Sequence, residues 1–144
     1  MKFYDRESEI AELKRLDALA EHTAQFTVLM GRRRTGKTTL MMKAFDGKPY
    51  LYFFIGKKAE PLQCMDFQRQ VESVLGLHVH GQVNNLTALF EELMSFARHT
   101  KVTLIIDEFQ RLVDINEDSI SGIQQVWDRY HAESHMHLIA CGSI

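Results

Sequence analysis

The sequence is short of cysteine and of long apolar runs, and each shortage excludes a class of protein. Cys64 and Cys141 are its two cysteines and stand far apart in no ligand spacing, so we expect small buried residues in a reducing compartment. No apolar run is long enough to cross a bilayer. Met1 is followed by charged residues rather than by a signal peptide. We therefore expect a cytoplasmic protein with no membrane partner.

An excess of charge of one sign is also lacking. The 144 residues carry 17 basic and 19 acidic side chains, a formal net charge of −2. This balance argues against non-specific electrostatic binding of nucleic acid, although it is compatible with a local basic patch. DNA is therefore a possible partner that the composition does not indicate. Hydrophobic residues make up 45% of the chain, and its length suffices for one domain with a core.

Short apolar segments alternate with amphipathic ones along the chain. Strands are expected at residues 26–30, 50–55, 102–106 and 137–141. Helices are expected at about 5–21, 38–45, 61–75, 86–97 and 120–130. Asn85 and Ser119 are the candidate N-caps of the last two helices. The alternation predicts an α/β fold in which helices cover both faces of a parallel sheet, with ligands bound beyond the carboxyl ends of the strands.

A phosphate-binding loop is predicted between the first strand and the second helix. Residues 31–38 match the pattern G-x-x-x-x-G-K-[ST] at every fixed position. Glycines let the backbone bend so that several N–H groups converge on one phosphate, and the following helix presents its positive end to the anion. The predicted nucleotide-binding residues are Gly31, Arg32, Arg33, Arg34, Thr35, Gly36, Lys37, Thr38 and Thr39.

Within this loop the residues have different roles. Lys37 is long enough to reach the β- and γ-phosphates, and the Thr38 hydroxyl is a hard oxygen ligand for Mg²⁺. The arginines at 32–34 fit either phosphate neutralisation or binding of a partner, but also a plain solvated surface. Thr39 fits a simple helical role as well.

Two carboxylates follow the third strand. Asp107 is expected to hold Mg²⁺, and Glu108 to polarise the water that attacks the γ-phosphate. A glutamate directly after the aspartate indicates hydrolysis rather than nucleotide storage. Gln110 fits either a γ-phosphate sensor or a surface residue. Ser143, which follows the fourth strand, is the candidate for a polar side chain near the γ-phosphate, although a Gly-Ser pair is also typical of a turn.

Taken together, these motifs resemble the archaeal-type AAA-like ATPase family of the signal-transducing STAND group of P-loop NTPases. The resemblance rests on residues 3–7 (Phe-Tyr-Asp-Arg-Glu), the loop at 31–38, residues 104–110 (Leu-Ile-Ile-Asp-Glu-Phe-Gln), Trp127-Asp128 and residues 141–143. Thr35 departs from the valine common in the family. The resemblance implies an ATP-binding core with strand order 5-1-4-3-2, and it nominates Arg6 and Glu7 as neighbours of the adenine, although both also fit a first helical turn.

The resemblance also sets expectations about what surrounds the site. The chain stops after the fourth strand, so we expect residues 1–144 to be a truncated core with strand order 1-4-3-2, whose fifth strand, lid and C-terminal domains are missing. The strand at 26–30 then becomes an exposed edge that invites self-association. ATP is expected rather than GTP through the resemblance, since no guanine-reading Asn-Lys-x-Asp motif is present.

Three functions compete at this point. The first is a Mg²⁺-dependent ATP-binding and ATP-hydrolysing core of a regulatory or switch ATPase, with ADP and ATP as its ligands. The second is a nucleotide-binding or interaction module without turnover. The third, a small-molecule kinase, lacks an arginine-rich lid between residues 59 and 100. The histidine pairs 78/80 and 135/137 would share a face on a strand, but no cysteine or acid completes a metal site. The aromatic segment 50–54 is expected to be core.

Overall fold

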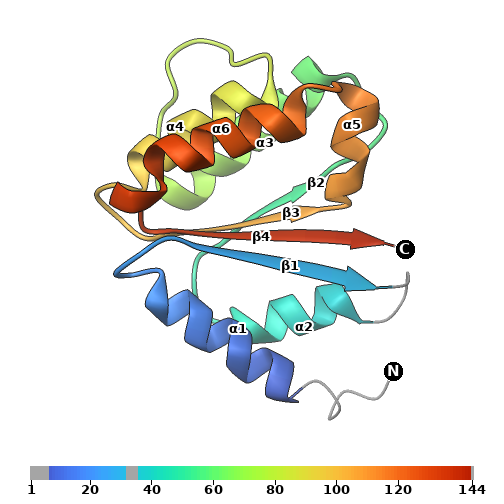
Figure 1. Ribbon diagram of the computed structural model, residues 1–144. Helices are drawn as coiled ribbons and strands as arrows, with labels where there is room; N and C mark the ends of the chain where they lie inside the picture. Colours follow the sequence, from blue (N-terminus) through green and yellow to red (C-terminus); the bar gives the residue numbers. More distant parts are fainter. Residues whose placement is uncertain (1–6, 32–35, 144) are drawn as a thin grey trace.

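A four-stranded parallel sheet lies at the centre of the structure, a computed structural model that describes residues 7–31 and 36–143 (Figure 1). In spatial order its strands are β1 (Gln25–Gly31), β4 (Met136–Ser143), β3 (Val102–Asp107) and β2 (Leu51–Phe54). Each neighbouring pair is parallel. The α/β class and the order 1-4-3-2 are therefore confirmed, and the four strands lie within two residues of the predicted segments.

Helices form a layer on each face of this sheet (Figure 1). One face carries α1 (Glu7–Leu19) and α2 (Lys37–Ala44). The other carries α3 (Glu60–Leu75), α4 (Leu86–Phe96) and α6 (Ser119–Tyr130), with the short α5 (Leu112–Ile115) beyond β3. Every residue of β3 is buried, as a strand covered on both sides must be. No helix in the described ranges is both long and apolar enough to cross a membrane.

The helix ends follow the predicted caps in one case and not in the other. Asn85 Oδ1 accepts a hydrogen bond from the Ala88 N–H at 2.8 Å, which confirms it as the N-cap of α4. The prediction for Ser119 is wrong, because this residue is already the first of α6 and its buried hydroxyl has no hydrogen-bond partner among the described residues. The turn is set earlier, where Asn116 Oδ1 accepts from the Asp118 N–H at 3.0 Å.

Both cysteines are buried, as predicted. Burial raises the pKa of each thiol to about 12, so both stay protonated and behave as small apolar groups. The aromatic segment, by contrast, is only partly core. Phe53 is buried, but Phe54 is 48% exposed and Tyr52 directs its hydroxyl into the site described below.

A buried polar network ties α1 to the amino ends of the central strands. Asp17 is 1% exposed, and its carboxylate accepts hydrogen bonds from His137 Nδ1 (2.9 Å), Thr103 Oγ1 (2.8 Å) and Lys101 Nζ. His137 Nε2 in turn lies 2.9 Å from Thr27 Oγ1. This network explains why a histidine is tolerated at a fully buried position.

The two histidine pairs lie in different surroundings. His78 and His80 lie in the loop after α3 and not on a strand, with their rings 5.7 Å apart in an edge-on contact. His137 is hydrogen-bonded to Asp17 through its Nδ1 atom. Within residues 7–31 and 36–143, no group of three or more histidine, cysteine or acidic side chains is placed to hold a metal ion.

The strand β1 is an edge of the sheet in the described part of the chain, where it pairs with β4 only. Phe26, Val28 and Met30 lie on one face of this strand and are each at least half exposed. Phe26 contacts Trp127 of α6 edge-on, with ring centroids 5.7 Å apart, and an apolar pocket lies between α6 and the face of the sheet formed by β1, β4 and β3. The expected exposed edge is therefore present.

Candidate functional site

The predicted phosphate loop joins the carboxyl end of β1 to the first residue of α2. Gly36 has φ of 83°, a left-handed conformation that favours glycine, and its carbonyl accepts the first helical hydrogen bond, from Leu40 N. The strand–loop–helix context that the motif requires is thus present. Residues 32–35 and Arg6 lie outside the described residues, so the predictions for the arginines at 32–34, for Thr35 and for Arg6 stay predictions.

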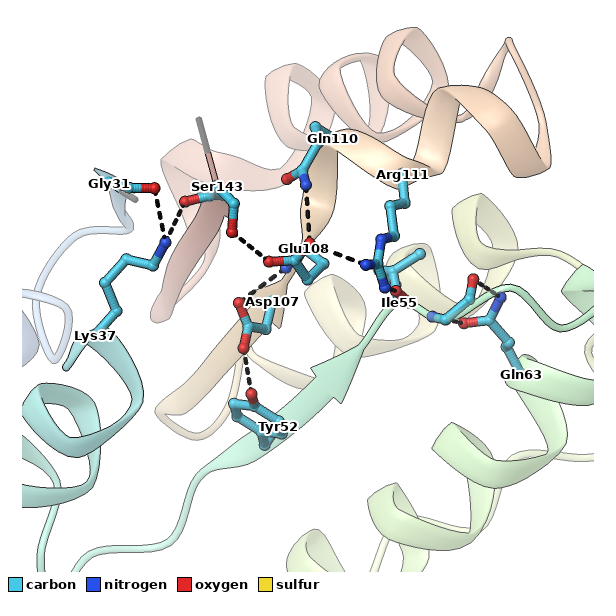
Figure 2. A network of polar contacts seen from close by, with 12 residues as sticks. Gly31, Lys37, Tyr52, Ile55, Gln63, Asp107, Glu108, Gln110, Arg111 and Ser143 are labelled. Carbon is cyan, nitrogen blue, oxygen red and sulfur yellow. Dashed lines mark hydrogen bonds and ion pairs between the residues drawn. The ribbon is translucent and has the colours of Figure 1, made fainter. Parts of the chain in front are cut away.

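Lys37 bridges the ends of two strands. Its Nζ donates to the Gly31 carbonyl at 3.1 Å and to the Gly142 carbonyl at 2.6 Å (Figure 2). The register of β1 and β4 places Gly31 beside Ser143. The ammonium group therefore sits at the carboxyl edge of the sheet, between β1 and β4, and is held by two neutral carbonyls that an anionic phosphate can replace.

Asp107 and Thr38 approach one another through Tyr52. The Tyr52 hydroxyl donates to Asp107 Oδ2, and the Thr38 side chain lies close to the same phenol group. Burial raises the pKa of Tyr52, and the neighbouring Asp107 carboxylate raises it further. Two hard oxygen donors in this arrangement fit Mg²⁺, which prefers carboxylate and hydroxyl oxygens. Sequence reasoning missed Tyr52; the signal available was a phenol on a strand, whose polar tip needs a partner.

Glu108 lies at the next position and is held from two sides (Figure 2). Its φ of 57° is unusual for a residue with a side chain, so the backbone turns sharply at the end of β3. Ser143 Oγ donates to Glu108 Oε1 at 2.6 Å, which brings two of the three predicted catalytic residues, Lys37 being the third, into direct contact. On the other oxygen, Oε2, Gln110 Nε2 donates at 3.0 Å and Arg111 Nη2 lies at 3.4 Å.

Gln110 is therefore a neighbour of Glu108 rather than a solvated surface residue. Its amide oxygen lies against Gly142, where an added Cβ would come within 2.9 Å of it and within 2.8 Å of Met30 Sδ. A glycine at position 142 thus lets Gln110 approach the end of β4. Whether Gln110 contacts a γ-phosphate stays a prediction.

The remaining predicted residues lie apart from this cluster. Thr39 is exposed on α2, and Glu7 is exposed at the start of α1. Arg111, which sequence reasoning did not single out, reaches Glu108 instead. The site thus brings together Gly31, Lys37, Thr38, Asp107, Glu108 and Ser143, with Tyr52, Gln110 and Arg111 around them.

Comparison with known proteins places the chain among ATPases. Residues 3–144 match the sequence profile of a family of ATPase domains found predominantly in Archaea. An uncharacterized protein of Methanocaldococcus jannaschii is 28% identical over 141 residues, which is 98% of this chain and 29% of that relative. A second protein of the same organism is 38% identical over 58 residues, 40% of this chain and 56% of that relative. The chain thus spans less than two thirds of either curated relative.

Solved structures show the same fold at low sequence identity. A Walker-type ATPase of Pyrococcus abyssi superimposes with a TM-score of 0.65 at 16% identity, over 97% of this chain and 45% of that one. Cdc6p of Pyrobaculum aerophilum gives 0.59 at 18% identity, over 96% and 39%. The Drosophila ORC bound to DNA gives 0.64 at 18% identity, over 99% and 38%.

Proposed function

The chain belongs to the family of ATPase domains found predominantly in Archaea, and on that premise we propose that it is the Mg²⁺-dependent ATP-binding and ATP-hydrolysing core of a regulatory switch ATPase. The observation that carries the proposal is the contact of Ser143 Oγ with Glu108 Oε1, beside the Lys37 ammonium held by Gly142. A carboxylate, a hydroxyl and a cation meet there, and such groups can orient an attacking water and neutralise charge on a phosphate.

Each residue has a role that follows from its contacts. Lys37 exchanges the Gly31 and Gly142 carbonyls for the β- and γ-phosphates, because an anion is the better acceptor for an ammonium group. Thr38 and Asp107 would hold Mg²⁺, which would neutralise charge on the phosphates. Glu108 takes a proton from the attacking water. Ser143 orients Glu108 and contacts the γ-phosphate, so it links the state of the nucleotide to the end of β4.

The partners follow from the same proposal. ATP and ADP are the ligands, and the arginines at 32–34 serve either phosphate neutralisation or contact with a partner. The regulated output lies in C-terminal domains of the same protein, as the family resemblance predicts, and the exposed edge at β1 serves self-association in this 144-residue chain. DNA stays outside the proposal, since the net charge is −2. A cytoplasmic location stays a prediction.

Calorimetry with Mg²⁺–ATP, followed by phosphate release on the same samples, tests the proposal. We expect Lys37→Ala to weaken Mg²⁺–ATP binding by at least about tenfold, because it removes the charge that the phosphates need. Lys48→Ala, at an exposed lysine after α2, is the matched control and should bind as the wild type does. Equal affinity in the wild type and in Lys37→Ala contradicts the assigned phosphate loop.

The release assay then separates the competing functions. Phosphate release without an acceptor supports hydrolysis. Binding without release identifies a nucleotide-binding module, and transfer that depends on an added acceptor identifies a kinase. Removal of Mg²⁺ with a chelator should stop release, since Thr38 and Asp107 then have no ion to hold.

A further inference from the structure

The carboxylate of Glu108 has a different neighbour on each oxygen. Oε1 contacts Ser143, which lies next to the Gly142 carbonyl that holds Lys37. Oε2 accepts a hydrogen bond from Gln110 and pairs with Arg111, both in the 3₁₀ helix η2 (Phe109–Arg111), and Arg111 lies on the side of β2, where it bonds Ile55. Figure 2 shows Glu108 between Ser143 and Arg111, with Lys37 on the side of Ser143. Oε1 is therefore the carboxylate oxygen on the side of Lys37.

Arg111 is fixed by groups other than Glu108. Its Nη1 donates to the Ile55 carbonyl at 3.2 Å, and its guanidinium carbon lies 5.7 Å from the centroid of the Phe54 ring. The Arg111 side chain is 23% exposed, so it is substantially shielded from solvent. A planar guanidinium held by a carbonyl and an aromatic ring keeps its orientation when Glu108 moves, and so it can act as a fixed point for the carboxylate.

The backbone that receives Arg111 is itself held in place. Gln63 of α3 is 3% exposed, and its amide bonds the loop after β2 three times. Its Oε1 accepts from Gly56 N at 3.0 Å, while its Nε2 donates to Gly56 O at 3.2 Å and to Lys58 O at 2.8 Å. A continuous set of contacts therefore runs from α3 through this loop and Arg111 to Glu108 (Figure 2).

We propose, on the basis of the proposed function, that Arg111 is a positioning residue for hydrolysis. Arg111 is held at the end of β2 and pairs there with Glu108 Oε2, so that Glu108 Oε1 points towards the γ-phosphate. Arg111 itself touches neither nucleotide nor water. Without this anchor the carboxylate samples other orientations, and the fraction of bound nucleotide with Glu108 in line with the water falls. Since the phosphates are held by Lys37 and the loop, binding of the nucleotide does not depend on Arg111.

Steady-state phosphate release and calorimetry on Arg111→Met and Arg111→Lys test this inference. In Arg111→Met, which keeps an unbranched apolar stem but removes the guanidinium, we expect kcat to fall about tenfold or more, because a misplacement of about 1 Å in a reacting group can cost up to about a hundredfold. Affinity for Mg²⁺–ATP should be unchanged. Arg111→Lys should recover part of kcat, since it restores the charge beside Oε2 but not the fork that also reaches Ile55.

Arg129→Met is the matched control, because Arg129 also pairs with a glutamate, Glu91, but on the exposed side of α6. It should leave kcat and affinity as in the wild type. An unchanged or raised kcat in Arg111→Met overturns the inference, and so does an equal loss in Arg111→Lys. A loss of Mg²⁺–ATP affinity equal to the loss of kcat overturns it too, because Arg111 would then support the site as a whole.

Failure of the proposed function is distinguishable from failure of this inference. A wild-type protein that binds Mg²⁺–ATP but releases no phosphate refutes hydrolysis. The contact between Arg111 and Glu108 is then tested by the melting temperatures of Arg111→Met, Glu108→Gln and the double variant. A melting-temperature shift in the double variant that is smaller than the sum of the two single shifts supports the contact, whereas a shift equal to that sum overturns it.

Discussion

Replacement of Asp17 by asparagine tests how strongly the buried network holds the sheet. The side chain keeps its size, but the charge that His137, Lys101 and Thr103 address is lost, and an amide N–H group replaces one acceptor. Removal of one partner from a buried ion pair costs about 3–5 kcal/mol, and the partial exposure of Lys101 brings our expectation for the free energy of unfolding to a loss of about 2–4 kcal/mol at pH 7. Urea unfolding, followed by circular dichroism, measures this loss.

The pH dependence of stability carries the same information. Burial alone would raise the pKa of Asp17, but hydrogen bonds from His137, Lys101 and Thr103 outweigh it and lower the pKa from 3.8 to about 2. The folded state thus favours the ionised carboxylate, which contributes about 2 kcal/mol of stability above the unfolded pKa. This contribution is present above about pH 4 and is lost as the pH falls towards 2. The difference in the free energy of unfolding between the wild type and Asp17→Asn should therefore become smaller over that range.

Asp66→Asn is the control for this prediction. Asp66 also pairs with basic side chains, Lys58 and Arg69, but at the surface, where water and salt screen the charge. This variant should unfold at the same urea concentration as the wild type at pH 7. If Asp17→Asn does the same, or if its gap from the wild type is constant between pH 5 and pH 2, the network does not hold the fold as argued.

Two further predictions concern the site and the edge of the sheet. Glu108→Gln keeps an oxygen for Ser143 but cannot take a proton, so phosphate release should fall at least about a hundredfold while calorimetry finds Mg²⁺–ATP binding retained; undiminished release would remove Glu108 from the mechanism. Self-association through β1 should appear as a dimer in sedimentation, and Val28→Lys should shift it to monomer, because a charge on an edge strand opposes pairing. A wild-type monomer at all concentrations would contradict this.

Much of the fold could be predicted because its strands are nearly continuous apolar runs that end at a glycine or a polar residue. The segment at 102–106 is an apolar run, which predicts a buried strand without knowledge of its neighbours, and the structure buries every residue of it. The order of the strands could not be predicted from local patterns, because these do not say which strands pair. That prediction came from the family resemblance. Ser119 was mistaken for a cap because a serine before an apolar run is typical of one, whereas the side chain of Asn116 three residues earlier made the turn.

The site divides in the same way. That Lys37, Asp107, Glu108 and Ser143 lie near one another could be predicted, because each is at or beyond the carboxyl end of a strand, and parallel strands end at the same edge of the sheet. The contacts of Tyr52 and Arg111 could not, since they join residues 55 and 56 positions apart in the chain. Neither motif position nor periodicity encodes such pairs; they depend on how β2 lies beside β3.

The two ends of the sheet are linked by the strands that they share. Each of three strands carries one residue of the Asp17 network near its start and one residue of the site at its end: Thr27 and Gly31 on β1, Thr103 and Asp107 on β3, His137 and Ser143 on β4. A slip of one residue between two strands would turn every side chain of one of them to the other face. Because the network accepts only one register, it also fixes Ser143 beside Gly31 and so sets the position from which Ser143 meets Glu108.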